Sequence, residues 1–398
     1  MTLKINFSQL YILLFSLLSL SCSKHGKTDT IQTVVKEGAL PTMQPSKVNY
    51  PKLNEAYIES KCVSIDRFCQ KYWKNENSNL SFLVAKNGQI IYEKYQGVAN
   101  KQNNILINHD TPIHIASVSK VLTATAILLL IDGKKLELDQ KVNTLLEGFP
   151  YPDITIKTLL DHRSGLRNYA YFTEEKGVWD RQKTLTNQDI LTLFKTKNIQ
   201  LEYPTNTRFT YCNTNYAMLA LVIEKITGLN YRDAMQQMIF KPLDMKDTYV
   251  FDYDKDRETA TPSYKGNNVR IAFDYLDKVY GDKNIYSTPR DLLKFDMARN
   301  ANTFLTQNLR SQIYKGYSNE HKGTKNYGLG IRMIEWETGQ KFYFHNGWWH
   351  GNTSSYITLD KEKVTIIALS NRFTKNTYAV RKLVPLFGDY PFKTDDDE

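Results

Sequence analysis

The order of strand-forming and helix-forming segments constrains this chain most strongly. Residues 81–85 and 89–95 flank the turn signal Lys86-Asn87-Gly88, which predicts a β-hairpin near the start. Strand patterns return only near the other end, and the stretch between them is helical in character. We therefore predict an α+β fold in which one antiparallel sheet is built from both chain ends, is flanked by helices and carries an inserted, mostly helical region. The late strands are expected at 327–336, 341–344, 353–359 and 364–369.

The inserted region contains a helix that should be buried. Residues 121–131 are apolar nearly all round, which places that helix in the interior rather than at the surface. The sheet and the helical region should meet at a cleft, where binding sites tend to form. Other helices are expected at 155–160, 216–226, 291–297 and 376–386.

The first residues are typical of an export signal. Lys4 precedes a mostly apolar stretch over 7–20, which is shorter than the about 20 residues that a membrane span needs. The stretch ends at Cys22 and resembles a bacterial lipoprotein signal, in which that cysteine becomes lipidated; a plain secretory signal is the alternative. A lipidated Cys22 would tether the protein to a membrane without spanning it.

These features divide the chain into four parts. We predict a signal peptide over 1–21, a lipid-anchored flexible linker over 22–50, a main domain over 51–392 and an acidic tail over 393–398. The protein is then exported to the cell envelope and anchored on the periplasmic or surface side of a membrane.

The charge is basic but scattered. The chain has 52 lysines and arginines against 42 aspartates and glutamates, a net charge of +10, and no basic run beyond pairs such as Lys134-Lys135. Together with the export signal, this predicts a solvated cationic surface and no nucleic-acid partner. We expect a monomer.

Two cysteines of the main domain lie close in sequence. Cys62 and Cys69 are seven residues apart. On one helix they would lie about 10 Å apart on one face, which exceeds the reach of a disulfide. We expect two buried thiols, and a bridge stays open as an alternative if the segment is not helical.

A candidate nucleophile opens the buried helix. Ser117 and Lys120 lie three residues apart, so at a helix start they share one face. A serine hydroxyl needs a neighbouring base to become a nucleophile, and a buried lysine can serve as one. The pattern S-x-x-K arises often by chance, and a capping serine beside a surface lysine is the alternative.

Two further motifs follow in order. Tyr211-Cys212-Asn213 lies just ahead of the helix at 216–226, on an expected loop from which Tyr211 and Asn213 can both point into one cleft. His345-Asn346-Gly347 lies at the end of the strand at 341–344, where Gly347 lets a substrate backbone approach closely.

This ordered set resembles the three-motif pattern of serine β-lactamases and penicillin-binding proteins. The Tyr-x-Asn form of the second motif points to the branch related to class C β-lactamases, which also holds D-alanyl-D-alanine carboxypeptidases, D-aminopeptidases and esterases. The resemblance extends over roughly residues 51–390, with Asn284 standing where a glycine is usual. Supporting segments lie at 155–166, 285–292 and 327–330.

The resemblance implies a role for each motif residue. Ser117 would attack a carbonyl and become acylated, while Lys120 and Tyr211 move protons and Tyr211 is a candidate base for the deacylating water. Asn213 would bind the substrate amide. The backbone N–H groups of Ser117 and Trp348 would form the oxyanion hole, worth about 3 kcal/mol for each donor. No metal ion or organic cofactor is implied.

The third motif departs from that of true β-lactamases. His345 stands where they carry lysine, and a neutral histidine holds a substrate carboxylate less firmly. We therefore expect a serine hydrolase that cleaves an amide or ester bond of a small molecule or peptide, peptidase- or esterase-like, through an acyl-serine intermediate. A class C-type β-lactamase and a non-catalytic tethered binding protein are the alternatives. His162 and His350 are expected to support the structure rather than react.

Overall fold

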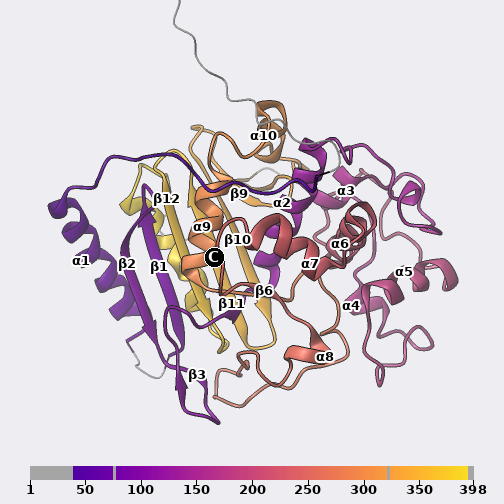
Figure 1. The fold of residues 1–398 in the computed structure, drawn as a ribbon, viewed down its shortest axis with the longest axis horizontal. Coiled ribbons are helices and arrows are strands. Elements are labelled where there is room, and N and C mark those ends of the chain that lie inside the picture. The colour runs from indigo at the N-terminus through magenta and orange to yellow at the C-terminus, as the bar shows by residue number, and fades with distance from the viewer. Residues whose placement is uncertain (1–38, 75–77, 321–322, 393–398) are drawn as a thin grey trace, which may run out of the picture. The chain divides into compact units, whose positions relative to one another are not determined.

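A seven-stranded antiparallel sheet lies at the centre of the structure (Figure 1). The computed structural model describes residues 39–74, 78–320 and 323–392, so the predicted signal peptide, the Cys22 anchor and the tail at 393–398 lie outside the described residues. The strand order is β2-β1-β12-β11-β10-β9-β8. The strands are β1 Leu80–Lys86, β2 Gln89–Gln96, β8 Lys325–Tyr327, β9 Arg332–Glu335, β10 Lys341–Trp349, β11 Asn352–Leu359 and β12 Val364–Ser370.

The pairing of β1 with β12 confirms that the sheet is built from both chain ends. Ser81 lies opposite Leu369, and the register continues to Lys86 opposite Val364. In Figure 1 the indigo β1 lies beside the yellow β12. Alternate side chains of each strand enter different apolar cores, so both faces of the sheet are covered.

One face of the sheet packs against elements from both termini. Helix α1 (Glu55–Tyr72) contacts β2, while α11 (Asn376–Ala379) and the 3₁₀ helix η4 (Val380–Leu386) contact the last strands. The single helix predicted at 376–386 is wrong in its second half. Pro385 has no N–H to donate, and the chain tightens into 3₁₀ turns there.

The other face carries the buried helix and the inserted region. Helix α2 (Ser119–Asp132) is buried along nearly its whole length, as its pattern predicts, and packs on α6 (Asn213–Thr227). Helix α9 (Pro289–Arg299) lies against β1 and β12. The remaining helices are α3 Ile156–Leu160, α4 Tyr169–Phe172, α5 Asn187–Thr196, α7 Tyr231–Met235, the π-helical turn Gln236–Phe240, α8 Tyr253–Asp256 and α10 Gln307–Ile313.

Two small sheets complete the fold. Strands β5 (Ile113–His114), β7 (Ile285–Ser287) and β6 (Tyr249–Val250) pair in that order. Strand β5 leads directly into the nucleophile segment. Strands β3 (Val98–Asn100) and β4 (Ile105–Leu106) pair separately. Among the described residues, no helix combines the length and apolarity needed to cross a membrane.

Two sequence boundaries need correction. The strand expected at 327–336 is two strands, β8 and β9, because Gly330 takes a positive φ of 84° and turns the chain back. The predicted flexible linker ends earlier than residue 50. The compact unit begins at Leu40, and within it Met43 is buried and its N–H donates to Met238 O at 2.8 Å.

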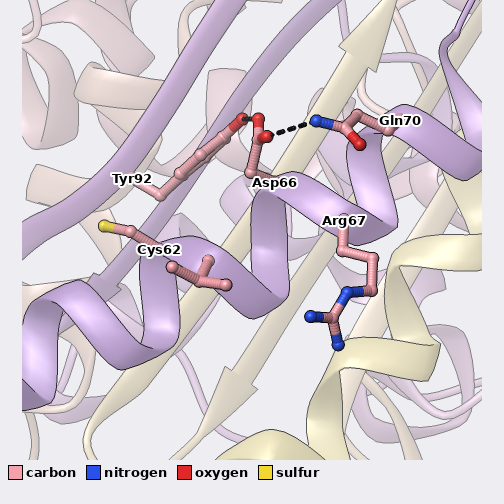
Figure 2. Close-up of a pocket in the computed structure, with 6 residues that line it drawn as sticks. Cys62, Asp66, Arg67, Gln70 and Tyr92 are labelled. Atoms are coloured by element: carbon pink, nitrogen blue, oxygen red, sulfur yellow. Dashed lines mark hydrogen bonds between the residues drawn. The ribbon is translucent and has the colours of Figure 1, made fainter.

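Both cysteines of the first helix are free thiols. Cys62 and Cys69 lie on α1, as the expected helical arrangement requires, and they are not bridged; the prediction that both are buried is wrong for Cys62. Cys69 is buried and burial raises its pKa to about 11, whereas Cys62 is only half-buried and donates to Ile91 O. Figure 2 shows Cys62 at a shallow pocket beside Asp66, which accepts hydrogen bonds from Tyr92 and Gln70.

Candidate active site

The nucleophile candidate lies in a strained turn. Ser117 is in a short 3₁₀ turn (Ala116–Val118) that leads directly into α2. The preceding Ala116 has a φ of 47°, which costs energy for any residue with a Cβ. Its N–H donates to Nδ1 of the buried His114 at 3.1 Å, and this bond helps to hold the turn.

Lys120 meets Ser117 inside the protein. The Lys120 side chain is fully buried, and Nζ donates to Ser117 Oγ at 3.2 Å and to the carbonyl of Asp282 at 2.8 Å. Nζ also lies 5.1 Å from the ring centroid of Tyr211 and 5.6 Å from that of Tyr216. The spacing predicted from sequence thus brings the amine, the hydroxyl and Tyr211 together.

The second motif is positioned by a histidine. The N–H of Cys212 donates to His162 Nδ1 at 3.1 Å, and the rings of His162 and Tyr211 lie 4.4 Å apart. His162 is buried, and burial with the nearby cations lowers its pKa well below the usual value, so the ring is neutral and its Nδ1 accepts. These contacts support the expected structural role of His162, which is to hold Cys212 and the ring of Tyr211 in place.

Asn213 is the first residue of α6, not part of a loop as expected. Its Oδ1 is buried and has no hydrogen-bond partner among the described residues. A buried carbonyl oxygen without a donor is costly, so this atom is suited to accept from a substrate N–H.

The third motif lies inside β10 rather than after a strand. His345 is fully buried, its Nδ1 donates to Asn346 O at 2.9 Å and its Nε2 lies 3.3 Å from the hydroxyl of Tyr327. Burial, followed by the positive charges of Arg332 and Lys120, holds the pKa of His345 well below its usual range. The ring is therefore neutral and carries no charge for a substrate carboxylate.

Gly347 touches the nucleophile segment. A Cβ on Gly347 would lie 2.6 Å from Ile115 O and 2.8 Å from the backbone N of Ser117, closer than side chains approach. The next residue, Trp348, exposes 63% of its surface, and its indole N–H donates to His350 O at 2.9 Å. The glycine thus allows β10 to run directly beside Ser117, where an oxyanion hole is expected.

Arg332 is a site residue that sequence reasoning missed. Its guanidinium lies 4.6 Å from the ring centroid of Tyr211 and 5.8 Å from that of Tyr327. Among the ion pairs of the described chain, none involves Arg332. The only sequence signal was its place just after the segment Tyr327-Gly328-Leu329-Gly330, and the turn at Gly330 is what directs it to Tyr211.

His350 belongs to a separate cluster beside the site. Its Nε2 lies 2.9 Å from Asp277 Oδ2, and the indole N–H of Trp349 donates to Asp277 Oδ1 at 2.7 Å. Asp274, Asp277 and His350 have ligand atoms close enough to hold a metal ion. Both oxygens of Asp277 already accept hydrogen bonds, one of them from the backbone N–H of Asp274, so Asp277 and His350 form a structural pair.

This arrangement is typical of a serine hydrolase that works through an acylated serine. The serine contacts a buried lysine, a tyrosine packs over that lysine, and a strand of the sheet runs beside the nucleophile. Comparison with known proteins gives the family. The beta-lactamase family model matches residues 65–384, and the chain belongs to that family.

Its relatives include hydrolases. The chain is 28% identical over 320 residues to penicillin-binding protein 4* of Bacillus subtilis, covering 75% of this chain and 69% of the relative. It is 27% identical to a teichoic acid D-alanine hydrolase of Staphylococcus aureus, covering 71% and 72%. A D-aminopeptidase of Cereibacter sphaeroides is 26% identical, covering 72% of this chain but 55% of that protein.

The fold is shared with solved structures. A penicillin-binding protein from Bacillus halodurans superposes with a TM-score of 0.71 at 22% identity, covering 81% of this chain and 99% of that one. FmtA from Staphylococcus aureus gives a TM-score of 0.67 at 21% identity, covering 89% and 94%. The chain is a serine hydrolase of the peptidase- and esterase-like kind.

Proposed function

We propose that this protein hydrolyses a bond to D-alanine, either the peptide bond of a D-alanyl-D-alanine terminus or a D-alanyl ester, through an acylated Ser117. The contact between the buried Lys120 Nζ and the partly exposed Ser117 Oγ, 3.2 Å long, carries the proposal. One relative is named as a teichoic acid D-alanine hydrolase and another as a D-aminopeptidase; the first name supports D-alanine, and the second supports a D-amino-acid substrate in general.

The residues divide the chemistry as follows. Ser117 Oγ attacks the carbonyl, and its proton passes to the pair formed by Lys120 and Tyr211, whose amine and ring lie beside one another. The N–H groups of Ser117 and Trp348 receive the developing oxyanion, and Asn213 Oδ1 accepts from the substrate amide. The scissile bond then breaks, and the leaving amine or alkoxide takes up that proton and departs. Tyr211 directs a water molecule at the acyl group, the bond to Ser117 breaks, the acid is released and the Ser117 oxygen takes a proton from the water.

Arg332 supplies the positive charge that the third motif lacks. With a neutral His345, the guanidinium beside Tyr211 is the cation available to an anionic substrate group. Arg332→Gln should therefore raise KM for a D-alanyl-D-alanine peptide about tenfold, with kcat little changed. It should leave KM for neutral p-nitrophenyl acetate as it was. Arg310→Gln, on α10, is the matched control.

A fluorophosphonate probe tests the nucleophile. The protein should be labelled, Ser117→Ala should lose the label, and Ser119→Ala, which removes the other serine of the motif, should keep it. Equal labelling of the wild type and Ser117→Ala would refute the acyl-serine mechanism, and no labelling of any form would favour a non-catalytic binding protein. A panel of p-nitrophenyl esters, D-alanyl substrates and nitrocefin ranks the substrates, and fastest turnover of nitrocefin would favour the class C-type β-lactamase.

We also propose that the protein is an exported lipoprotein anchored through Cys22. The sequence that precedes Cys22 supports this location. Cys22→Ser should move the protein from the membrane fraction to the soluble fraction of the cell envelope. Retention of the variant in the membrane fraction would contradict the anchor.

A further inference from the structure

A cavity lies on the face of β10 that points away from Ser117. Side chains alternate along β10, so Asn346 points away from the face that carries His345 and Gly347. The cavity has a volume of about 540 Å³, within the range of small-molecule sites. Its lining comes from the end of α1, from β10 and from the α11–η4 segment: Tyr72, Asn346, Lys375, Asn376, Tyr378, Ala379, Arg381 and Lys382.

The lining is cationic. Lys375, Arg381 and Lys382 contribute three positive charges, and no acidic residue lines the cavity. Among the ion pairs of the described residues, none involves these three side chains. The sequence from residue 371 to 388 contains no aspartate or glutamate at all. The charges therefore have no internal counter-ion and favour an anion from outside.

The cavity is joined to the third motif by hydrogen bonds. Tyr378 OH donates to Gly347 O at 3.0 Å, and burial raises the Tyr378 pKa to about 12, which keeps the hydroxyl a donor. Asn346 is held by Ser355, whose Oγ donates to Asn346 Oδ1 at 2.9 Å. An occupant of the cavity therefore lies against the backbone that flanks Ser117.

We propose that this cavity binds a phosphate-bearing group, either the headgroup of an anionic lipid or a soluble phosphate ester. Arg381 offers the planar donor pair that grips phosphate oxygens, and Lys375 and Lys382 offer point charges. A carboxylate carries one negative charge, so it would neutralise only one of the three cations around the cavity. The tyrosine rings of Tyr72 and Tyr378 give the organic part of the ligand an apolar wall. The proposal is independent of the reaction at Ser117.

The test uses the full chain carrying Cys22→Ser, so that lipidation at that cysteine tethers none of the proteins. Titration calorimetry at low salt measures binding of sn-glycerol 3-phosphate, and flotation measures binding to phosphatidylcholine vesicles with and without phosphatidylglycerol. The variant Lys375→Gln/Arg381→Gln/Lys382→Gln should weaken binding about tenfold or more. The matched control Lys134→Gln/Lys225→Gln/Lys241→Gln removes the same charge from exposed sites elsewhere and should bind as the parent does.

Each outcome decides the proposal. Binding of the soluble ester, of the phosphatidylglycerol vesicles, or of both, lost in the cavity variant alone, supports it and names the source of the phosphate. No binding by the parent, or equal loss in the cavity and control variants, overturns it. Equal circular dichroism spectra and melting temperatures show that the variants are folded. Ser117→Ala should bind as the parent does, so failure of the proposed hydrolysis and failure of this site are distinguishable.

Discussion

Gly347→Ala is the sharpest probe of the site, because it adds one methyl group where β10 meets the nucleophile. The new carbon would lie 2.6 Å from Ile115 O and 2.8 Å from Ser117 N, and it would also strike Ser354 Oγ. Ser354 Oγ already donates to Ile115 O at 2.6 Å, so that hydroxyl has little freedom to move. Gly347 does not have a positive φ, so a side chain there is opposed by lack of space alone.

The magnitude follows from these contacts. Carbon atoms rest about 3.5–4.0 Å from their neighbours, so the contacts of 2.6 and 2.8 Å require β10 and the Ser117 turn to separate by about 0.7–1.4 Å. A displacement of about 1 Å at a reacting centre costs about 100-fold in rate. Loss of one oxyanion donor costs about 100- to 1000-fold, or about 3 kcal/mol. We expect kcat for p-nitrophenyl acetate to fall about 100- to 1000-fold in Gly347→Ala.

The assay pairs this variant with Gly266→Ala. A Cβ at Gly266 would meet only Phe373 O at 3.6 Å, an ordinary contact, so activity there should stay at the wild-type level. Melting temperatures of both variants separate a local effect from unfolding. Activity of a folded Gly347→Ala within about threefold of the wild type would refute the placement of the oxyanion hole beside Gly347.

Three further predictions follow from the site and its surroundings. Tyr211→Phe keeps the ring against His162 but removes the hydroxyl, so deacylation should slow about 100-fold and a burst of p-nitrophenol should precede slow turnover. An unchanged steady-state rate without a burst would contradict the role of Tyr211. His114 has its pKa lowered to about 4 by burial, so the unfolded chain takes up a proton below about pH 6.5 before the native state does, and about 3 kcal/mol of stability present at pH 7 is lost by pH 4. His114→Gln should show this loss reduced by that amount in urea unfolding at the two pH values, and parallel curves would contradict it. Ellman's reagent should titrate Cys62 in the native protein far faster than Cys69, and both after unfolding, whereas protection of both in the unfolded, unreduced chain would reveal a bridge.

Local patterns predicted much of this fold because they report local physics. The hairpin at β1 and β2 follows from its turn signal, and the burial of α2 follows from its all-round apolar surface. Asn284 illustrates the same point. It stands where the resemblance expects glycine, and it adopts a φ of 72°, a left-handed conformation that asparagine tolerates better than other residues with a side chain.

Tertiary context decided what the patterns missed. Helix α1 was not among the predicted helices, although Asn54 caps it and Glu55 and Lys71 favour its two ends; its packing on β2 was not visible in the sequence. The sequence at 327–336 predicts one strand, and the turn at Gly330 divides it into two. Asp282 reaches the site through a backbone carbonyl, which any residue type would supply, so its bond to Lys120 left no trace in the sequence.

His345 and Arg332 are best understood as one feature. A lysine at position 345 would lie fully buried near two existing cations, Lys120 and Arg332, whose charges already depress the pKa of the histidine. Three cations so close together would repel one another, and the neutral ring avoids this cost. In the proposed function, the positive charge for the substrate comes instead from Arg332 on β9, over the ring of Tyr211. On that proposal the histidine is not simply a missing lysine, because Arg332 supplies the cation from a strand outside the three sequence motifs.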